Sequence, residues 1–241
     1  MKKGVFQKAL AFVLALVVVV TGVFPNGVIS VKAAEDNLIL YYNFDLQNSF
    51  ATVIPDASGN QNLGELKSNS GGSVEGTYSI NEVNIYGDTV KALNLTGGSS
   101  GPYLQMPNGI LNGNDAVTIS MWVNLSTDNS YQRIWDFGND TTNYMYLLSD
   151  GANAGFTGYA AAITTGGWSA ETGVQKETNI DKNRWVLTTV VMDGSTMSLY
   201  ENGALIGTKD TGIKVSDLGD TTNNYIGKGQ FADNPTVGQF A

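Results

Sequence analysis

Residues 184–207, with the sequence RWVLTTVVMDGSTMSLYENGALIG, constrain the fold of this chain more than any other stretch. β-branched residues and leucine dominate residues 185–192, which is the composition of a strand. Asp193 and Gly194 end that run, and Asn202 with Gly203 provides a second break of the kind that tight turns require. We predict three antiparallel strands joined by two hairpins, in a sheet that has to pack against another sheet.

The chain beyond residue 33 keeps the same character. Short apolar runs alternate with Gly, Asn, Asp and Ser, and no stretch shows a helical period. Further strands are predicted at residues 37–44, 90–95, 103–106, 117–125, 133–138, 144–148 and 158–164. Residues 65–88 are polar and glycine-rich, and we interpret them as an extended loop or a weak edge hairpin. This pattern predicts an all-β fold, a two-sheet antiparallel jelly-roll sandwich.

The first 33 residues are typical of a secretory signal peptide. Lys2, Lys3 and Lys8 form a basic start, an apolar run covers residues 9–24, and residues 31–33 (Val-Lys-Ala) suit signal peptidase. A membrane anchor is the alternative, but the apolar run is shorter than the roughly 20 residues of a spanning helix. We expect cleavage after Ala33, a secreted bacterial protein and no membrane partner after cleavage.

The residue composition excludes several classes of function. Removal of the first 33 residues leaves nine basic and 22 acidic residues, a formal net charge of −13, which disfavours nucleic acid as a partner. The chain has no histidine and no cysteine. Ser-His-Asp triads, Cys-His pairs and histidine-based zinc sites are therefore excluded. Nothing in the sequence indicates an oligomer, and we expect a monomer.

The order of residues from Trp185 through Asp193-Gly194-Ser195-Thr196 to LYENGALIG at 199–207 resembles the laminin G-like domains of the concanavalin A-like lectin/glucanase group. Residues 117–125 and 225–228 are similar to further strands of that family. The resemblance implies one concanavalin A-like domain over residues 36–241. In the family a final strand pairs with the first one, and we expect it beyond residue 241, so that the domain is truncated before its last strand. The family's activities differ widely.

The resemblance also implies a structural calcium ion. Many members hold calcium between an acid that follows the first strand, a loop of the type DxSGNxN and an acid in the last strand. Here Asp45 follows the first predicted strand, and Asp56, Asn60 and Asn62 belong to the loop. Carboxylate and amide oxygens suit this hard cation. A plain Asx turn is the alternative.

One tryptophan in a glycine-rich stretch is the main candidate for ligand binding. Trp168 follows Gly166 and Gly167 and could offer a flat face to a sugar ring. The alternative is a loop residue that folds back on the rim of the sandwich. We predict that Tyr144, Tyr146 and Tyr159 line the same concave face. Trp122 is interpreted as a core residue.

Catalytic carboxylates of glycanases with this fold lie on one strand in the pattern ExDxE, which places the glutamates on one face. The chain lacks that pattern, since Glu171 and Glu177 have no aspartate between them and Glu201 stands alone. We predict a noncatalytic extracellular carbohydrate-binding module, part of a larger secreted glycan-degrading protein with a possible glycoside hydrolase domain downstream. The alternatives are a catalytic glycoside hydrolase or lyase of the same fold, and an adhesion, protein-contact or spacer module.

Overall fold

The computed structural model describes residues 37–45, 51–98, 101–127, 129–151, 155–231 and 238–241. The chain divides into two compact units, Met1–Asn37 and Leu38–Ala241. The signal peptide predicted for residues 1–33 lies outside the described residues. Within them, the second unit contains fifteen strands and two short 3₁₀ helices, η1 (Trp168–Ala170) and η2 (Val215–Leu218). No helix in the described ranges is long and apolar enough to cross a membrane.

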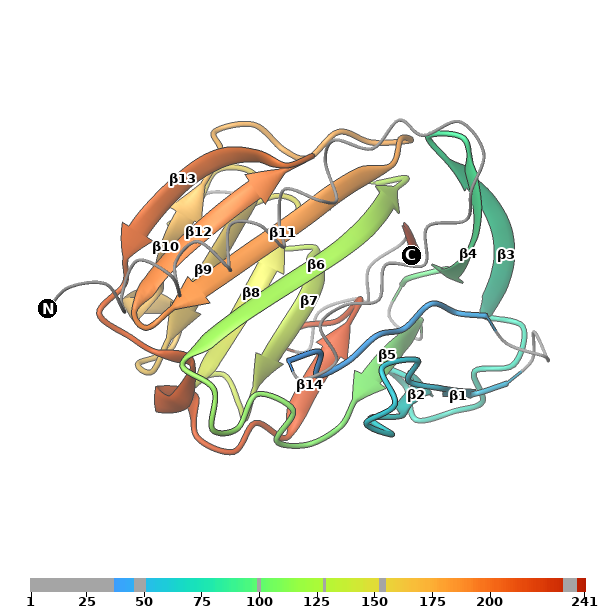
Figure 1. Cartoon of the computed structure of the whole chain (residues 1–241), viewed down its shortest axis with the longest axis horizontal. Coiled ribbons are helices and arrows are strands. Elements are labelled where there is room, and N and C mark those ends of the chain that lie inside the picture. The colour runs from blue at the N-terminus through green and yellow to red at the C-terminus, as the bar shows by residue number, and fades with distance from the viewer. Residues whose placement is uncertain (1–36, 46–50, 99–100, 128, 152–154, 232–237) are drawn as a thin grey trace, which may run out of the picture. The chain divides into compact units, whose positions relative to one another are not determined.

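An eight-stranded antiparallel sheet forms one layer of this unit (Figure 1). Its strands, in spatial order, are β1 (Val53–Ile54), β2 (Gly64–Ser68), β5 (Pro102–Met106), β14 (Asn223–Ile226), β7 (Arg133–Gly138), β8 (Tyr144–Leu148), β9 (Ala160–Thr164) and β10 (Thr172–Gln175). Every residue of β7, β8 and β9 is buried. Both faces of this part of the sheet are therefore covered by side chains, because alternate residues of a strand point to opposite faces.

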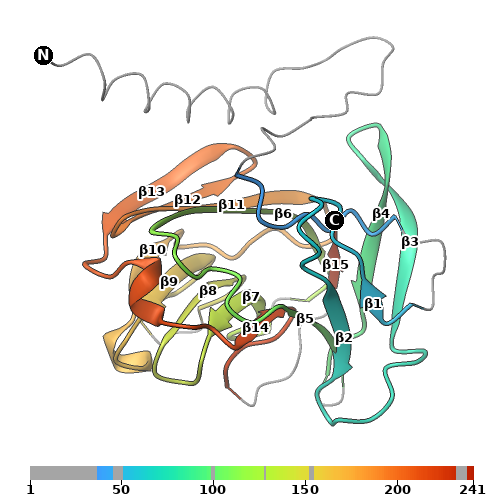
Figure 2. The same cartoon turned by 60° about the horizontal axis from the view of Figure 1, so that its bottom comes forward.

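A seven-stranded antiparallel sheet forms the second layer, as Figure 2 shows for β13, β12, β11 and β6 above β9, β8, β7 and β14. Its strands, in spatial order, are β13 (Ala204–Asp210), β12 (Thr196–Glu201), β11 (Val186–Asp193), β6 (Ala116–Leu125), β15 (Gly238–Phe240), β4 (Asp88–Leu95) and β3 (Tyr78–Ile85). The three strands predicted within residues 184–207 are confirmed as β11, β12 and β13. The predicted two-sheet jelly-roll sandwich is confirmed as well.

The main core fills the space between the two sheets. Val190 and Leu199 of the seven-stranded sheet belong to the same buried cluster as Trp135, Met145 and Leu147 of the eight-stranded sheet. Full burial of each such side chain contributes about 1.5–3 kcal/mol. A core of this extent explains how a chain without cysteine holds its fold.

The first predicted strand is wrong, since residues 37–45 contain no strand. The backbone groups of this segment form hydrogen bonds with side chains of the loop at residues 56–62, and not with a neighbouring strand. The Tyr41 N–H donates to Asp56 Oδ1 at 2.9 Å, and the Ile39 carbonyl accepts the Asn62 side-chain amide at 2.8 Å. Such side chain–backbone bonds compete with a strand ladder, which explains the difference.

Two further expectations, about residues 65–88 and about Trp122, are corrected, and one strand was not predicted. Residues 65–88 contain most of β2 and all of β3, which pairs with β4 over eight residues, so this region is more than a loop or a weak hairpin. Residues 238–240, where no strand was predicted, form β15 between β4 and β6, and the expectation of a further strand beyond residue 241 stays a prediction. Trp122 is not a core residue: it is partly exposed, on the opposite face of β6 from the buried Val123, and its ring lies 5.6 Å from that of Tyr86.

Candidate functional site

The face of the eight-stranded sheet that points away from the main core, here called the outer face, carries an unusual set of side chains. Asp136 of β7, Tyr146 of β8 and Ala162 of β9 are direct cross-strand neighbours and therefore share it. A second apolar cluster lies there, with Tyr144, Tyr146 and Phe156 among its members and Phe231 packed against it. This face thus holds polar groups within an apolar surrounding.

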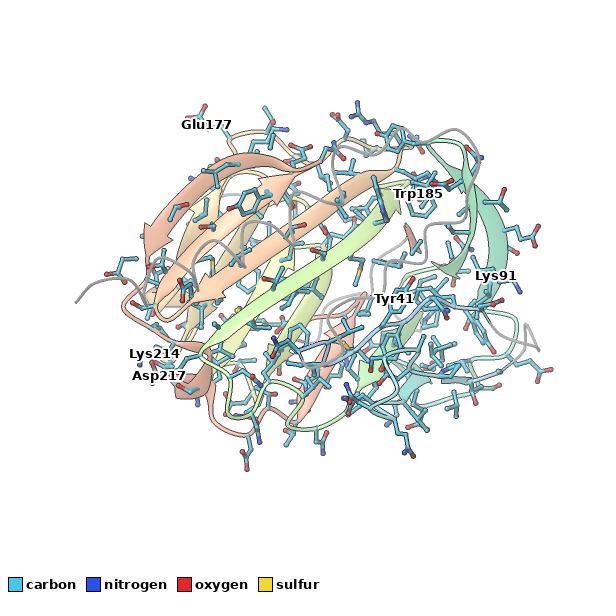
Figure 3. All side chains as sticks on the ribbon, viewed as in Figure 1. Tyr41, Lys91, Glu177, Trp185, Lys214 and Asp217 are labelled. Carbon is cyan, nitrogen blue, oxygen red and sulfur yellow. The ribbon has the colours of Figure 1, made fainter. Side chains whose placement is uncertain are left out.

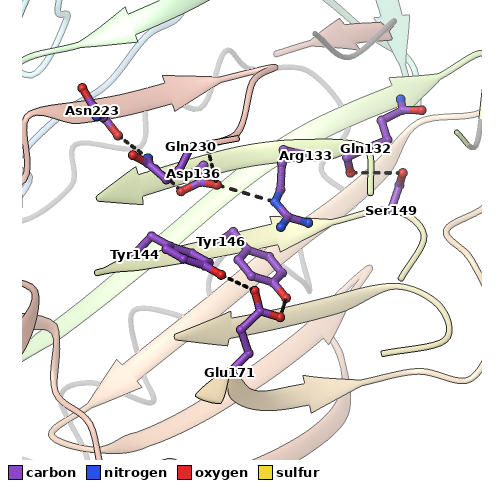
Figure 4. Close-up of polar contacts among 9 residues, drawn as sticks. All are labelled: Gln132, Arg133, Asp136, Tyr144, Tyr146, Ser149, Glu171, Asn223 and Gln230. Carbon is purple, nitrogen blue, oxygen red and sulfur yellow. Dashed lines mark hydrogen bonds and ion pairs between the residues drawn. The ribbon is translucent and has the colours of Figure 1, made fainter. Parts of the chain in front are cut away.

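A charged pair occupies the middle of the outer face (Figure 4). Asp136 is fully buried and its Oδ2 lies 3.5 Å from Nε of Arg133, which is 5% exposed. The Arg133 guanidinium lies 3.7 Å from the centre of the Tyr146 ring. Gln230 donates to Asp136 from its backbone N–H at 3.3 Å and from Nε2 at 3.0 Å. These bonds hold the segment around Gln230 over β7, and they provide hydrogen-bond donors to the buried Asp136 carboxylate.

Glu171 joins this face to the connection between β9 and β10. Its two carboxylate oxygens accept hydrogen bonds of 2.6 Å from the hydroxyls of Tyr144 and Tyr146. Burial raises the pKa of the Tyr144 hydroxyl well above its usual value, and the bond to Glu171 adds to this. Burial likewise raises the pKa of Tyr146, although Arg133 acts in the opposite direction. Both hydroxyls therefore stay protonated and donate to Glu171.

Hydrogen bonds with Thr142 and Thr164 hold the tip that carries Trp168, here called the Trp168 tip (residues 164–168). Gly167 has a φ of 75°, a conformation that favours glycine, and its N–H donates to the Thr142 carbonyl at 3.0 Å. The Thr164 hydroxyl donates to the Gly167 carbonyl at 2.9 Å and accepts from the Gly166 N–H at 3.0 Å. Trp168 opens helix η1 and is 67% exposed. A fixed backbone therefore presents an exposed indole ring to solvent.

The predicted tyrosines divide between the two faces of the sheet. Tyr144 and Tyr146 share the outer face, where both are buried and bound to Glu171, three residues after Trp168. Tyr159 belongs to the main core, and its hydroxyl donates to the Tyr200 carbonyl at 3.1 Å. The expectation that all three line one face is therefore wrong for Tyr159, which comes just before β9 and points to the other side of the sheet.

Sequence reasoning missed the polar residues of the outer face. The alternation in β7 and β8 does place Asp136, Tyr144 and Tyr146 on one face, so this part of the cluster was accessible to a period-2 argument. No local signal connects these strands with Glu171 or Gln230. Both contacts depend on how loops fold back over the sheet.

The residues predicted to bind calcium are held by protein groups. The Asp56 carboxylate accepts from the N–H groups of Tyr41, Ser58 and Asn62 at 2.8–3.0 Å and from the Ser58 hydroxyl at 2.7 Å. Burial acts to raise the pKa of Asp56, but these hydrogen bonds outweigh it and lower the pKa. Asn60 donates to the carbonyls of the 38–39 segment.

The fourth predicted calcium ligand has a different partner. Asp45 Oδ1 lies 3.3 Å from the ammonium group of Lys91. Figure 3 labels Lys91. The structure thus gathers Asp56, Asn60 and Asn62 in one loop, while Asp45 is paired with a lysine. In the described ranges, no group of three or more His, Cys, Asp and Glu side chains is placed to hold a metal ion. Calcium binding stays a prediction.

Comparison with known proteins places the chain in a family. A family model described as the concanavalin A-like lectin/glucanases superfamily matches residues 97–241. The chain is 31% identical over 210 residues to an alpha-L-arabinofuranosidase of Bifidobacterium longum subsp. longum, and the alignment covers 82% of this chain. It spans only 18% of the length of that curated relative.

Solved structures show the same fold at low sequence identity. Domain 4 of a GH43 extracellular arabinanase from Geobacillus stearothermophilus, in complex with arabinotriose, matches with a TM-score of 0.66 and 18% identity, over 84% of this chain and 88% of that chain. The binding domain of botulinum neurotoxin serotype D/C matches with a TM-score of 0.55 and 14% identity, over 86% and 47% of the two chains. The family model, together with the two-sheet fold, shows that the chain belongs to the concanavalin A-like lectin/glucanase superfamily.

Proposed function

We propose that residues 36–241 form a noncatalytic carbohydrate-binding module in which Trp168 is the main contact with the sugar. The observation that carries this proposal is the 67% exposure of Trp168 on a tip whose backbone is held by Thr142 and Thr164. An indole ring offers a large apolar face, and a fixed backbone reduces the entropy lost when a ligand binds. The family supports the proposal, since lectins give it part of its name.

The state of two carboxylates in the cluster of Figure 4, Asp136 and Glu171, supports a noncatalytic role. Glycoside hydrolysis requires two carboxyl groups that flank the bond to be cleaved. Asp136 is fully buried beneath Arg133 and Gln230. Glu171 uses both of its oxygens to accept hydrogen bonds from tyrosines. Neither group is thus available to act as a general acid or a nucleophile.

Arabinose-containing glycans are the first ligands to test. The curated relative is named as an alpha-L-arabinofuranosidase, and the arabinanase domain of the same fold was solved with arabinotriose. Arabinan is uncharged, which suits a chain with a formal charge of −13 after residue 33. We further propose that the module is secreted by way of the leader at residues 1–33, acts as a monomer and serves a larger glycan-degrading protein.

The test is binding of the purified protein to arabinotriose, linear arabinan, xylan and cellulose, measured by isothermal titration calorimetry and affinity gel electrophoresis. Trp168→Ala is expected to weaken binding by at least about tenfold, the loss typical of a central aromatic contact. Tyr86→Ala is the matched control, because Tyr86 is 76% exposed but belongs to the turn after β3 in the other sheet. A folded protein that binds none of these glycans would instead favour a spacer or protein-contact role.

A further inference from the structure

A shallow groove of about 460 Å³ lies on the outer face over β2 and β5, near the opposite edge of the sheet from β9 and β10. Its lining includes Glu65 and Lys67 of β2 and Gln105 of β5, together with Gln61 and Leu63 from the segment before β2. We call this the β2–β5 groove. Glu65, Gln105, Tyr225, Asp136 and Tyr146 are consecutive cross-strand neighbours, so the groove shares its face with the cluster of Figure 4.

Side-chain amides dominate the polar part of the groove. Gln61, Gln105 and Asn108 contribute amides, and Thr222 contributes a hydroxyl. Gln105 directs its Nε2 toward the Met106 carbonyl at 3.1 Å, which fixes the orientation of its carboxamide. Amides and hydroxyls can both donate and accept hydrogen bonds. A lining of this kind fits a ligand rich in hydroxyl groups.

The one positive and the one negative side chain that line the groove form an ion pair with each other. Lys67 Nζ lies 3.1 Å from Glu65 Oε2, and these are the two charged residues in its lining. Leu63 adds an apolar surface that is 52% exposed. A neutral ligand with both hydroxyl groups and a C–H face matches this combination, because a charged ligand would find no uncompensated partner here.

The wall of the groove is held in place before any ligand binds. The bonds of Asp56 fix the loop that leads into Gln61, and the Tyr42 hydroxyl donates to the Asn62 carbonyl at 2.8 Å. Gly64 allows this packing, since a Cβ there would lie 2.8 Å from Leu104 Cδ1 and 3.0 Å from the Tyr42 hydroxyl. A preorganised wall loses little entropy when it binds a ligand.

The groove and the Trp168 tip lie at the same end of the strands. The Thr222 N–H donates to the Gly138 carbonyl at 3.0 Å, and the Gly167 N–H donates to the Thr142 carbonyl in the next turn. Four strand spacings separate β5 of the groove from β9, which is about 19 Å at the usual distance between strands. The turn between β7 and β8 connects the two places.

We propose that the β2–β5 groove is a second subsite for a neutral oligosaccharide, and that one glycan chain can occupy the groove and the Trp168 tip together. This inference rests on the proposed glycan-binding function. Occupation of both subsites by one chain makes the second contact intramolecular, and such linkage can raise affinity by two or more orders of magnitude. Affinity should therefore depend on the length of the chain.

The test compares arabinotriose with linear arabinan on four proteins: the wild type, Leu63→Ala/Asn108→Ala, Trp168→Ala and the combination. Leu205→Ala is the matched control, since Leu205 is 57% exposed on β13 of the other sheet. We expect the groove variant to lose at least tenfold in affinity for arabinan and the combination to lose binding. Side-chain amide NMR signals of Gln61, Gln105 and Asn108 should shift with arabinotriose even in the Trp168→Ala protein.

The outcomes separate the two proposals. Binding that depends on Trp168, with unchanged arabinan affinity in the groove variant and unmoved groove amides, overturns the second subsite and leaves the proposed function intact. A wild-type protein that binds no glycan and shows no shifted signal overturns both. Thermal melts of each variant confirm that the exposed substitutions leave the fold unchanged.

Discussion

Glu171 accepts a 2.6 Å hydrogen bond from the hydroxyl of Tyr146, and this bond ties the base of the Trp168 tip to a buried strand. The second oxygen of the same carboxylate accepts the hydroxyl of Tyr144. The position of the Trp168 tip and the stability of the protein are therefore coupled. The same hydrogen bonds that hold the tip also satisfy two buried tyrosine hydroxyls.

Replacement of Glu171 by alanine should lower both stability and glycan affinity. Two buried tyrosine hydroxyls would lose their acceptor, at a cost of about 2–4 kcal/mol in the free energy of unfolding. Glu171→Gln keeps one acceptor oxygen and should cost less. Urea denaturation measures the change, with the exposed Glu177→Ala (labelled in Figure 3) as the control. A Glu171→Ala protein as stable as the control would contradict the structural role.

Asp136→Asn should destabilise the protein by about 3 kcal/mol, because removal of one partner leaves the buried Arg133 charge without its nearby carboxylate. The altered amide would also face the Nε2 donor of Gln230. The control is Asp181→Asn, which breaks the exposed ion pair with Arg184 and should cost less than 1 kcal/mol. Equal losses in the two variants, measured by chemical denaturation, would argue against a buried charge pair.

The Asp56 carboxyl should contribute to the loss of stability in acid. Its pKa is lower in the folded protein than its usual value of 3.8, so the unfolded chain takes up the proton first as the pH falls. The stabilisation is present above about pH 5 and disappears as the pH falls through the folded-state pKa. Asp56→Asn should flatten the dependence of unfolding free energy on pH between about 5 and 2.

A matched variant separates this titration from damage to the loop. Asn60→Ala removes bonds to the carbonyls of the 38–39 segment but no titrating group. It should therefore lower stability by a similar amount at every pH and keep the wild-type slope. A flattened slope in Asn60→Ala would show that loop integrity, and not the Asp56 proton, governs the acid response.

The calcium prediction is tested by thermal melts in calcium and then in chelator. If Asp56, Asn60 and Asn62 bind calcium, the melting temperature should rise, because a ligand of the native state adds about 2.7 kcal/mol at a hundredfold excess over Kd. Asp56→Asn should abolish the rise and Asp45→Asn should show whether that residue takes part. An unchanged melting temperature would contradict calcium binding by this loop.

The amino-acid sequence was sufficient for the strands with a strong alternating pattern. Residues 117–125 and 184–207 form β6 and the β11–β13 meander as predicted, since alternation and turn residues act over a few neighbouring positions. The exposure of Trp168 agrees with one of the two interpretations that its glycine neighbours allowed, and the tertiary structure decided between them. Local patterns of this kind need no knowledge of distant residues.

Long-range packing determined which face of each strand became core and which groups met on the outer face. Trp122 and Met121 are neighbours on β6 and similarly apolar, yet Met121 packs against the core and Trp122 contacts Tyr86. Tyr144 and Tyr159 are both buried, but on opposite faces of one sheet. Glu171 reaches Tyr144 and Tyr146, and Gln230 reaches Asp136, only because loops return over the strands. The burial of each side chain and the pairing of these polar groups depend on contacts across both sheets. No short stretch of sequence contains that information.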